Sequence, residues 1–313
     1  MPRRAVGPPA MTRLVNIAAG AALIAILTSF TLASRLAYSA ALAPQDLMAI
    51  RFATSGLLLL PFAIARRGSA LVGLDSMKLA AAGGVGFAAP AFVGLAIVPA
   101  SHAGALLHGA LPLFTFAIGF ALGRTAANAR RSAGTCLVAA ALAVIVWDSV
   151  GEGNWRQLGG AALILSASAI WSGFGLLSAR LKIDPIGTAA TVGVLSAVVY
   201  LPLYLTFLEP QLHRVELAPV LTQVAVQGVL VGTASVFVYS WVVLRLGAVG
   251  AAVCTALVPS ATALAAMPLL AEHPTTTMAY ALALLAAGSL LSLTGANPGS
   301  RRAAGNVAAE AGC

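Results

Sequence analysis

Charged side chains are scarce in this chain of 313 residues. Asp, Glu, Lys and Arg together make up 9% of the residues, and the mean hydropathy is +0.95. A soluble globular domain carries about 25% charged residues, so this chain lacks the charge that would cover a surface in water. We therefore exclude a soluble globular protein. Inside lipid, every backbone polar group must be bonded within the protein, which predicts helices.

The motifs of several enzyme classes are also absent. The three cysteines, Cys136, Cys254 and Cys313, have no spacing typical of a metal site or a disulfide framework, and we interpret them as small apolar filler. The sequence has no glycine-rich phosphate loop with lysine, no nucleophile elbow and no paired metal-binding histidines. No carboxylate lies near the centre of a long apolar stretch. We expect no enzyme, no cofactor and no bound metal.

Apolar stretches, in contrast, fill most of the chain. A helix that crosses a bilayer needs about 20 apolar residues, and a period of two, which would indicate barrel strands, is absent. The shortest stretch, 132–147, must borrow residues from its flanks. The sequence predicts an all-α integral membrane protein with ten transmembrane helices, over Leu14–Ala41, Leu47–Ala65, Leu79–Val98, Ala103–Gly123, Ser132–Trp147, Leu158–Ala179, Pro185–Leu208, Leu221–Leu244, Ala248–Ala271 and Thr277–Thr294.

The basic residues are distributed unevenly between the two sides of the predicted membrane. If the N-terminus is cytoplasmic, only Arg156 and Arg214 fall outside, while Arg35 and Arg51 lie within apolar stretches. This bias predicts a multi-pass protein of the cytoplasmic (inner) membrane with both termini cytoplasmic, and it explains the net charge of +9 without nucleic acid. The other 14 of the 18 basic residues fall inside: Arg3, Arg4, Arg13, Arg66, Arg67, Lys78, Arg124, Arg130, Arg131, Arg180, Lys182, Arg245, Arg301 and Arg302.

An internal repeat relates the two halves. Three pairs of prolines stand at corresponding places in the two halves: Pro44 and Pro185, Pro61 and Pro202, and Pro112 and Pro259. The first two pairs have the same separation in the sequence. The third separation is slightly larger, which a longer loop around 209–217 explains. Because each copy has five spans, the second enters the membrane from the opposite side. We predict two inverted five-helix repeats, 14–148 and 158–295, between a cytoplasmic tail (1–13) and a disordered tail (296–313), with a substrate site between the halves.

Short sequence strings, in a fixed order, carry a family resemblance. They are Ser34–Leu36, Ala43-Pro44, Ala49–Phe52, Leu57–Pro61, Ala169–Trp171, Arg180-Leu181, Leu246–Pro259 and Ala271–Thr275. In these strings the chain resembles the EamA family of the drug/metabolite transporter superfamily, over about residues 14–295. Two places depart from the family pattern: Gly123-Arg124 stands where Gly-Glu is common, and Leu27 or Phe30 where a Trp is common. The resemblance implies ten helices and transport of small metabolites, often amino acids, usually as export.

Two arginines within the apolar stretches are the most informative charges. An arginine near mid-bilayer costs at least about 2.5 kcal/mol, so a position that keeps one is a candidate site. We expect Arg35 and Arg51 to lie at similar depth and to form a basic patch below the outer mouth for a carboxylate or phosphate. The alternatives are snorkelling to the lipid headgroups, or pairing with Asp46.

Other candidate ligand contacts are uncharged. His108 precedes Pro112, which loosens the preceding turn and can bare a carbonyl group beside the imidazole. Phe30 and Trp171 are separated by the same offset as the first two proline pairs, so the repeat predicts that both face a central cavity; Tyr239 is a further candidate. For each of these residues, packing against neighbouring helices is the alternative.

Together these features predict a secondary transporter or facilitator of small polar metabolites such as amino acids, acting as an exporter. A lipid or lipid-phosphate translocase on the same scaffold is the alternative, and a membrane-embedded enzyme is a weaker one. The expected partners are a small-molecule substrate and the bilayer. Small-residue spacings such as Gly119-x-x-x-Gly123 and Gly228-x-x-x-Gly232 permit packing within the bundle or a homodimer contact.

The charge bias makes a direct prediction about topology. Reporter domains fused at Ala5 and at Ala309 should both give cytoplasmic signals, because the basic loops stay on that side of the membrane. A periplasmic signal from either fusion would contradict the predicted orientation.

Overall fold

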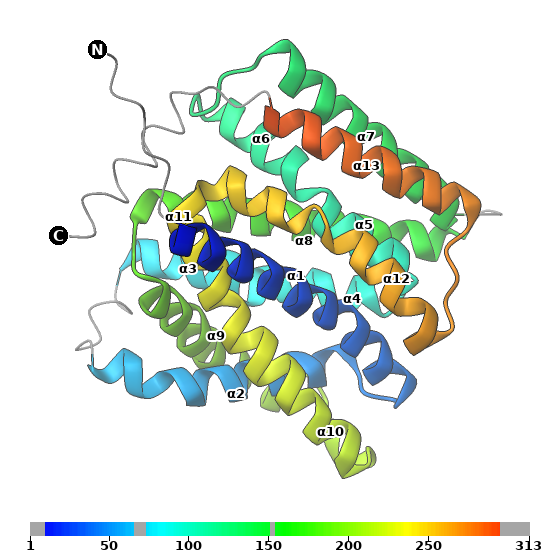
Figure 1. Ribbon diagram of the computed structural model, residues 1–313. Coiled ribbons are helices and arrows are strands. Elements are labelled where there is room, and N and C mark those ends of the chain that lie inside the picture. Colours follow the sequence, from blue (N-terminus) through cyan, green and yellow to red (C-terminus); the bar gives the residue numbers. More distant parts are fainter. Residues whose placement is uncertain (1–9, 66–72, 151–153, 295–313) are drawn as a thin grey trace.

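The computed structural model describes residues 10–65, 73–150 and 154–294, and over these residues the chain is helical with no strand (Figure 1). The helices run back and forth between two ends of one bundle. They are α1 (Ala10–Ser39), α2 (Pro44–Ala65), α3 (Leu74–Gly83), α4 (Val85–Leu95), α5 (Ala100–Gly109), α6 (Leu111–Ala121), α7 (Ala129–Val150), α8 (Trp155–Leu181), α9 (Pro185–Phe207), the 3-10 turn η1 (Leu212–Arg214), α10 (Leu217–Gln223), the π-helix η2 (Val224–Ser235), α11 (Val236–Thr255), α12 (Val258–Leu270) and α13 (Thr276–Thr294).

Eight helical segments of the described chain are long and apolar enough to cross a membrane, and two shorter apolar helices follow them. The expectation of an all-α, multi-pass membrane protein is confirmed at this level, whereas the count of ten crossings stays a prediction. The eight are Leu14–Ser39, Pro44–Ala65, Leu74–Leu95, Ala100–Ala121, Ala129–Asp148, Trp155–Leu181, Pro185–Phe207 and Leu217–Ala252; the two shorter ones are Val258–Leu270 and Thr276–Ser292.

Several predicted boundaries can be compared with the helices. The stretch 132–147 does extend into its flanks, since α7 covers Ala129–Val150. The sequence predicts an N-terminal tail over 1–13, but α1 begins at Ala10. Residues 1–9 and the predicted tail 296–313 lie outside the described residues, and so do the charges on them.

Two membrane-length segments, Leu74–Leu95 and Ala100–Ala121, are interrupted near their middle, and two more breaks lie farther along the chain. Proline cannot donate the backbone hydrogen bond of a helix interior but is tolerated in the first turn. Pro112 accordingly stands in the first turn of α6, after a break at Ala110, and Pro259 stands in the first turn of α12, after Leu257. The break between α3 and α4 is at Gly84. Gly247 turns the chain within α11, with φ 75° and ψ 168°.

Helices from the two halves of the chain pack against each other in pairs. α2 packs on α9, α7 on α13, and α5 on α12, while α4 packs on α8, and α1 on both η2 and α11. At the α7–α13 crossing, a Cβ added to Gly134 would collide with the backbone N of Ser292. Small residues at such crossings let helix backbones approach closely, which is how membrane helices gain packing energy. Gly228, in one predicted small-residue spacing, packs on Thr54 of α2 and so faces the bundle.

The α7–α13 contact gives a test of the fold with a defined sign. Gly134→Ala should destabilise the protein by about 1–3 kcal/mol, because the new methyl group meets backbone that cannot rotate away. The matched control is Gly159→Ala in α8, where nothing lies within 4 Å of the added Cβ. The control should be neutral or stabilising by up to about 1 kcal/mol, because alanine favours helix over glycine. Thermal unfolding in detergent measures both, and equal shifts would contradict the packing described.

Candidate functional site

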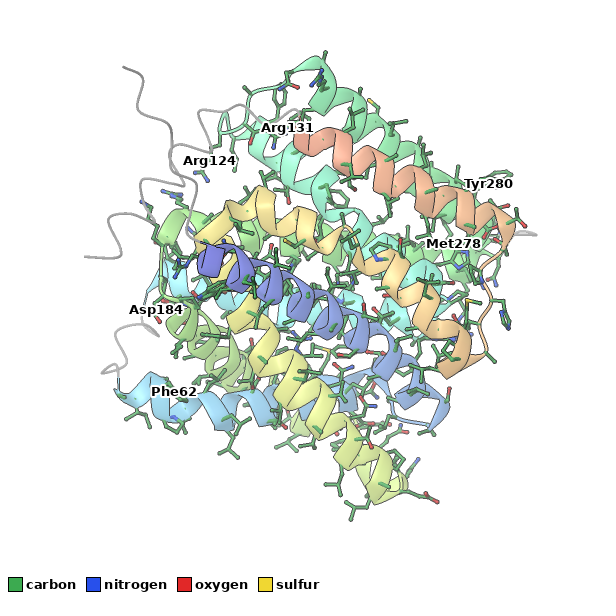
Figure 2. The ribbon with its side chains drawn as sticks, in the orientation of Figure 1. Phe62, Arg124, Arg131, Asp184, Met278 and Tyr280 are labelled. Atoms are coloured by element: carbon green, nitrogen blue, oxygen red, sulfur yellow. The ribbon has the colours of Figure 1, made fainter. Side chains whose placement is uncertain are left out.

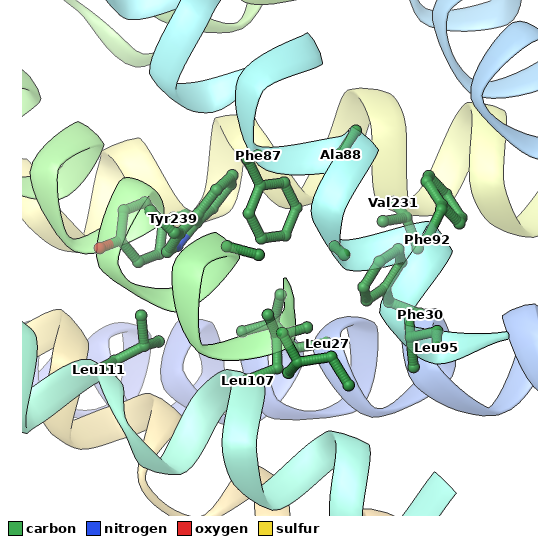
Figure 3. Close-up of a cluster of buried hydrophobic side chains, with 14 of the residues drawn as sticks. Leu27, Phe30, Phe87, Ala88, Phe92, Leu95, Leu107, Leu111, Val231 and Tyr239 are labelled. Atoms are coloured by element: carbon green, nitrogen blue, oxygen red, sulfur yellow. The ribbon is translucent and has the colours of Figure 1, made fainter. Parts of the chain in front are cut away.

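A cavity of about 10 Å³, room for about one water molecule, lies at the centre of the bundle. Helices from both halves of the chain enclose it, and Figure 3 shows Phe87 of α4 pointing toward Leu27 of α1 and Leu107 of α5. Most of its lining is apolar, and three side chains are polar. The lining residues are Leu27, Phe30, Arg51, Phe87, Leu107, His108, Leu111, Trp171, Val231 and Ser235.

Arg51 brings a positive charge into this cavity. The side chain leaves α2 with only 2% of the residue exposed, and its guanidinium lies over two rings, 5.6 Å from the Phe30 centroid and 5.8 Å from that of Phe87. Nη1 has no hydrogen-bond partner, and no carboxylate of the described residues forms an ion pair with Arg51. Contact with ring faces offsets part of the cost of burying a cation, but it does not neutralise the charge.

His108 places a second polar group on the cavity wall. It lies in the last turn of α5, just before the break at Ala110, and is 3% exposed. Its Nδ1 has no hydrogen-bond partner, so this nitrogen is free to donate or accept, according to the tautomer. Ser235 also lines the cavity; its hydroxyl donates to the Val231 carbonyl, which leaves its oxygen lone pairs as acceptors. The π-helical winding of η2 supplies both Val231 and Ser235, and π-helical segments are common at functional sites.

A continuous set of aromatic rings forms one wall of the site. The Trp171 ring centroid lies 4.6 Å from that of Phe87, 4.9 Å from that of Phe174 and 5.0 Å from that of Tyr239. Phe30 contacts the same set through Phe87, at 6.1 Å. Tyr239 therefore lies behind Trp171 and does not line the cavity. Such rings offer a flat apolar surface to the organic part of a ligand.

The structure places four of the six candidate residues on the cavity wall, a fifth directly behind that wall, and the sixth elsewhere. Phe30, Arg51, His108 and Trp171 line the cavity, Tyr239 supports its wall, and Arg35 lies elsewhere. The basic patch expected from Arg35 and Arg51 does not form, because Arg35 is bound at the end of the bundle where α1 ends. There Nη2 lies 3.5 Å from Oε1 of Glu272, and Nη1 donates to the Leu95 carbonyl at 3.3 Å.

The alternative pairing of these arginines with Asp46 does not occur either. Asp46 instead accepts hydrogen bonds from the Tyr204 hydroxyl at 2.5 Å and from the Gln211 backbone N at 3.2 Å. These bonds tie the start of α2 to the end of α9 and the loop that follows, so the carboxylate is already satisfied. The sequence could not reveal this, because both partners belong to the second half of the chain, at sequence separations of 158 and 165 from Asp46.

Polar side chains link several helices at the end of the bundle where Arg35 lies, which we call the Glu272 end. Glu272 Oε2 accepts from the Ala100 backbone N at 2.8 Å, at the start of α5. His102 is buried in the first turn of α5, with Nε2 2.9 Å from Oδ2 of Asp148. The Thr275 hydroxyl donates to the same oxygen at 3.0 Å. Hydrogen bonds thus close this end between α1, α5, α7 and the α12–α13 loop.

Other parts of the site were missed by sequence reasoning. Phe87 and Ser235 are ordinary residues of apolar stretches, and only their place at the cavity distinguishes them. Gln227 supports the site from behind, because its Nε2 donates to the Phe30 carbonyl and to the Ser34 hydroxyl, which fixes α1 against η2. Gln227 was not missed, because an amide in an apolar stretch already makes it a candidate from the sequence alone. Among the described residues, no group of three or more His, Cys, Asp or Glu is placed to hold a metal ion.

Comparison with known proteins supports the fold and leaves the activity open. No family model matches the chain, and no curated protein matches it. A solved structure described only as "Crystal structure of protein" is similar, with a TM-score of 0.62 and 21% sequence identity. The similarity covers 89% of this chain and 96% of that one. At this identity the likeness extends to the fold alone.

An unpaired buried charge should cost stability, which gives a test of the site that needs no ligand. Arg51→Met should raise stability by about 1–3 kcal/mol, because it removes the cost of an intramembrane cation and loses only the ring contacts. Arg35→Met is the matched control and should lower stability, since Glu272 loses a partner. Thermal unfolding of both variants in detergent measures the difference. A destabilised Arg51→Met with an unchanged Arg35→Met would show that the charge of Arg51 is compensated.

Proposed function

We propose that this protein is a secondary transporter or facilitator that moves small polar metabolites bearing a carboxylate across the cytoplasmic membrane. The observation that carries the proposal is Arg51, a buried cation without a counter-ion among the described residues that faces a central cavity between the two halves of the chain. A guanidinium holds a carboxylate through two parallel hydrogen bonds. A ligand with this group would neutralise the charge that the protein leaves open.

The proposed ligand is a small molecule with an anionic group and an apolar or aromatic body. The carboxylate would lie at Arg51, within reach of the free Nδ1 of His108, while the body would pack on Trp171 and Phe87. Amino acids and simple organic acids both fit this description. The amino-acid class itself comes from the resemblance to the EamA family, in which we place the chain as part of the proposal.

We propose further that the fold consists of ten crossings arranged as two inverted repeats. If the longest apolar segment is divided at Gly247 and the part after it is joined to α12 as one crossing, the chain with α13 has ten crossings. The break at Ala110 and the break at Leu257 have the same separation in the sequence as Pro112 and Pro259. The contacts between helices also fit a two-fold axis that exchanges the two halves. α2 contacts α9, α5 contacts α12 and α7 contacts α13, and the contact of α4 with α8 corresponds to the contact of α11 with α1.

The proposed mechanism is alternating access around the central cavity. A cavity of about 10 Å³ is too small for such a metabolite, so this conformation is closed around the site and transport requires the helices to move. The broken helices α5–α6 and α11–α12 allow movement of one half-helix without the other. With the predicted orientation, the Glu272 end faces outward, and its hydrogen bonds favour a state closed to that side. Export would then begin with binding from the cytoplasmic side.

Transport by arginine variants tests the proposal. In proteoliposomes, Arg51→Ala should reduce uptake of a labelled carboxylate or amino acid by about tenfold or more, because truncating one partner of a buried charge pair costs about 2–5 kcal/mol. Arg51→Lys should restore only part of it, since lysine lacks the planar fork. Tyr38→Phe, which removes one hydroxyl bonded to the Phe92 carbonyl away from the cavity, is the control for small structural change.

Three results would count against the proposal. Wild-type rates for Arg51→Ala would remove Arg51 from the transport site. Conversion of the labelled compound to a product would indicate an enzyme. Movement of a fluorescent phospholipid between leaflets, without uptake of any soluble compound, would support a lipid translocase instead.

A further inference from the structure

A second cavity, also about 10 Å³, lies between α6, α7, α11 and α13. The side chains that matter for its chemistry are Arg131 and Phe116, with Ser289 and Ser292 of α13 opposite them. It lies toward the end of the bundle opposite to Glu272. Figure 2 shows Arg131 near Arg124 at that end, and Met278 and Tyr280 at the other. None of the expectations from the sequence placed a site here.

Arg131 turns its charge into this cavity. It stands in the first turn of α7 and is 8% exposed, with its guanidinium 5.0 Å from the Phe116 ring centroid. The adjacent Arg130 is exposed. A basic residue that only anchors a helix end would be exposed, as Arg130 is. No carboxylate of the described residues forms an ion pair with Arg131.

Two hydroxyl groups complete the same cavity without partners of their own. Ser289 is 2% exposed, and neither its Oγ nor that of Ser292 has a hydrogen-bond partner. A buried hydroxyl that makes no hydrogen bond costs about 1–3 kcal/mol. The cavity therefore presents a guanidinium and two free hydroxyl donors together. The group that satisfies all three has several acceptor oxygens and a negative charge, as a carboxylate or a phosphate does.

The two ends of the α7–α13 pair differ in this respect. At the Glu272 end, Asp148 of α7 binds both Thr275, just before α13, and His102. At the opposite end, Arg131 of α7 and Ser289 of α13 lack such partners among the described residues. Both ends are formed by the same two helices, so the ends differ only in their polar groups. The Glu272 end has a carboxylate, Asp148, that binds its polar neighbours, and the end near Arg131 has no such carboxylate among the described residues.

The second cavity also adjoins the central one. Leu111 lines the central cavity and Pro112, the next residue, lines the second. The two cationic cavities thus approach each other at the start of α6, just after the α5–α6 break. An anion that moved from the end near Arg131 toward Arg51 would pass this break.

We propose that the Arg131 cavity is a second binding site for an anionic oxygen group, a carboxylate or a phosphate, held by Arg131 and the hydroxyls of Ser289 and Ser292. Because a cavity of about 10 Å³ holds about one water molecule, binding requires the surrounding helices to separate. Its place on the path of the substrate rests on the proposed function, but the site itself does not. Two sources supply this chemistry: a soluble carboxylate that enters from the nearby end, or the headgroup of a bound phospholipid.

The test uses the full chain with Arg51→Ala, so that the central site no longer contributes. The protein is placed in nanodiscs of phosphatidylcholine, and thermal stability is titrated with sodium acetate against sodium chloride of equal ionic strength. We expect acetate to stabilise this variant. Adding Arg131→Gln should weaken the acetate effect by about tenfold or more, because hydrogen bonds to a charged group contribute this much. Adding Arg130→Gln removes the same charge one residue away and should change nothing.

Two further arms complete the test. Ser289→Val should weaken acetate binding while keeping Arg131, which guards against loss of folding in the arginine variant. Nanodiscs with phosphatidylglycerol distinguish the sources. If this lipid stabilises the protein and abolishes the acetate effect, and does not stabilise the Arg131→Gln variant, the site holds a lipid phosphate; an unchanged acetate effect assigns the site to a soluble carboxylate. Equal responses to acetate and to phosphatidylglycerol with and without Arg131 would overturn the site. Transport by Arg51→Ala at the wild-type rate would overturn only the proposed function.

Discussion

The absence of water from the bilayer interior is the constraint on which this architecture depends. A helix can be interrupted there only where other protein groups surround the freed backbone. The breaks at Gly84, Ala110 and Leu257 all fall within the packed bundle, because α5 lies against α12 and α4 lies against α8. The central cavity adjoins one of these breaks. Packing that satisfies the backbone therefore also provides an enclosed space with polar groups on its wall.

The same constraint makes each buried charge significant. At the Glu272 end, charged and polar groups of separate helices satisfy one another: Arg35 with Glu272, and His102 with Asp148. Arg51 and Arg131 are buried at least as deeply but face rings and cavities. A membrane protein can replace such residues by apolar ones at a gain in stability, so a retained unpaired cation points to a ligand that supplies the missing charge.

Sequence reasoning located the helices well, because hydropathy reports the length of an apolar segment directly. The prolines Pro112 and Pro259 also marked two helix breaks, because proline removes a backbone hydrogen bond, whereas the pair Pro61 and Pro202 lies inside continuous helices. The break at Gly84 was not predicted, because glycine has many uses besides interruption. The turn at Gly247, in contrast, falls between the predicted spans Leu221–Leu244 and Ala248–Ala271.

The candidate site was predicted in part, and the reasons are local. Arg51, His108, Phe30 and Trp171 stood out because a polar or aromatic residue is conspicuous in an apolar stretch, and the offset of the internal repeat joined two of them. Arg35 stood out equally, yet its partner, Glu272, lies in the other half of the chain. Arg131 was hidden among the basic residues that orient the chain.

Whether a side chain points into the bundle or out of it is decided by the position of the residue around the helix axis and by the groups on the facing helices. Arg130 and Arg131 are adjacent in the sequence, but Arg130 is exposed, whereas Arg131 is buried against Phe116. The first charge can therefore anchor the protein at the membrane surface, and the second can bind a ligand.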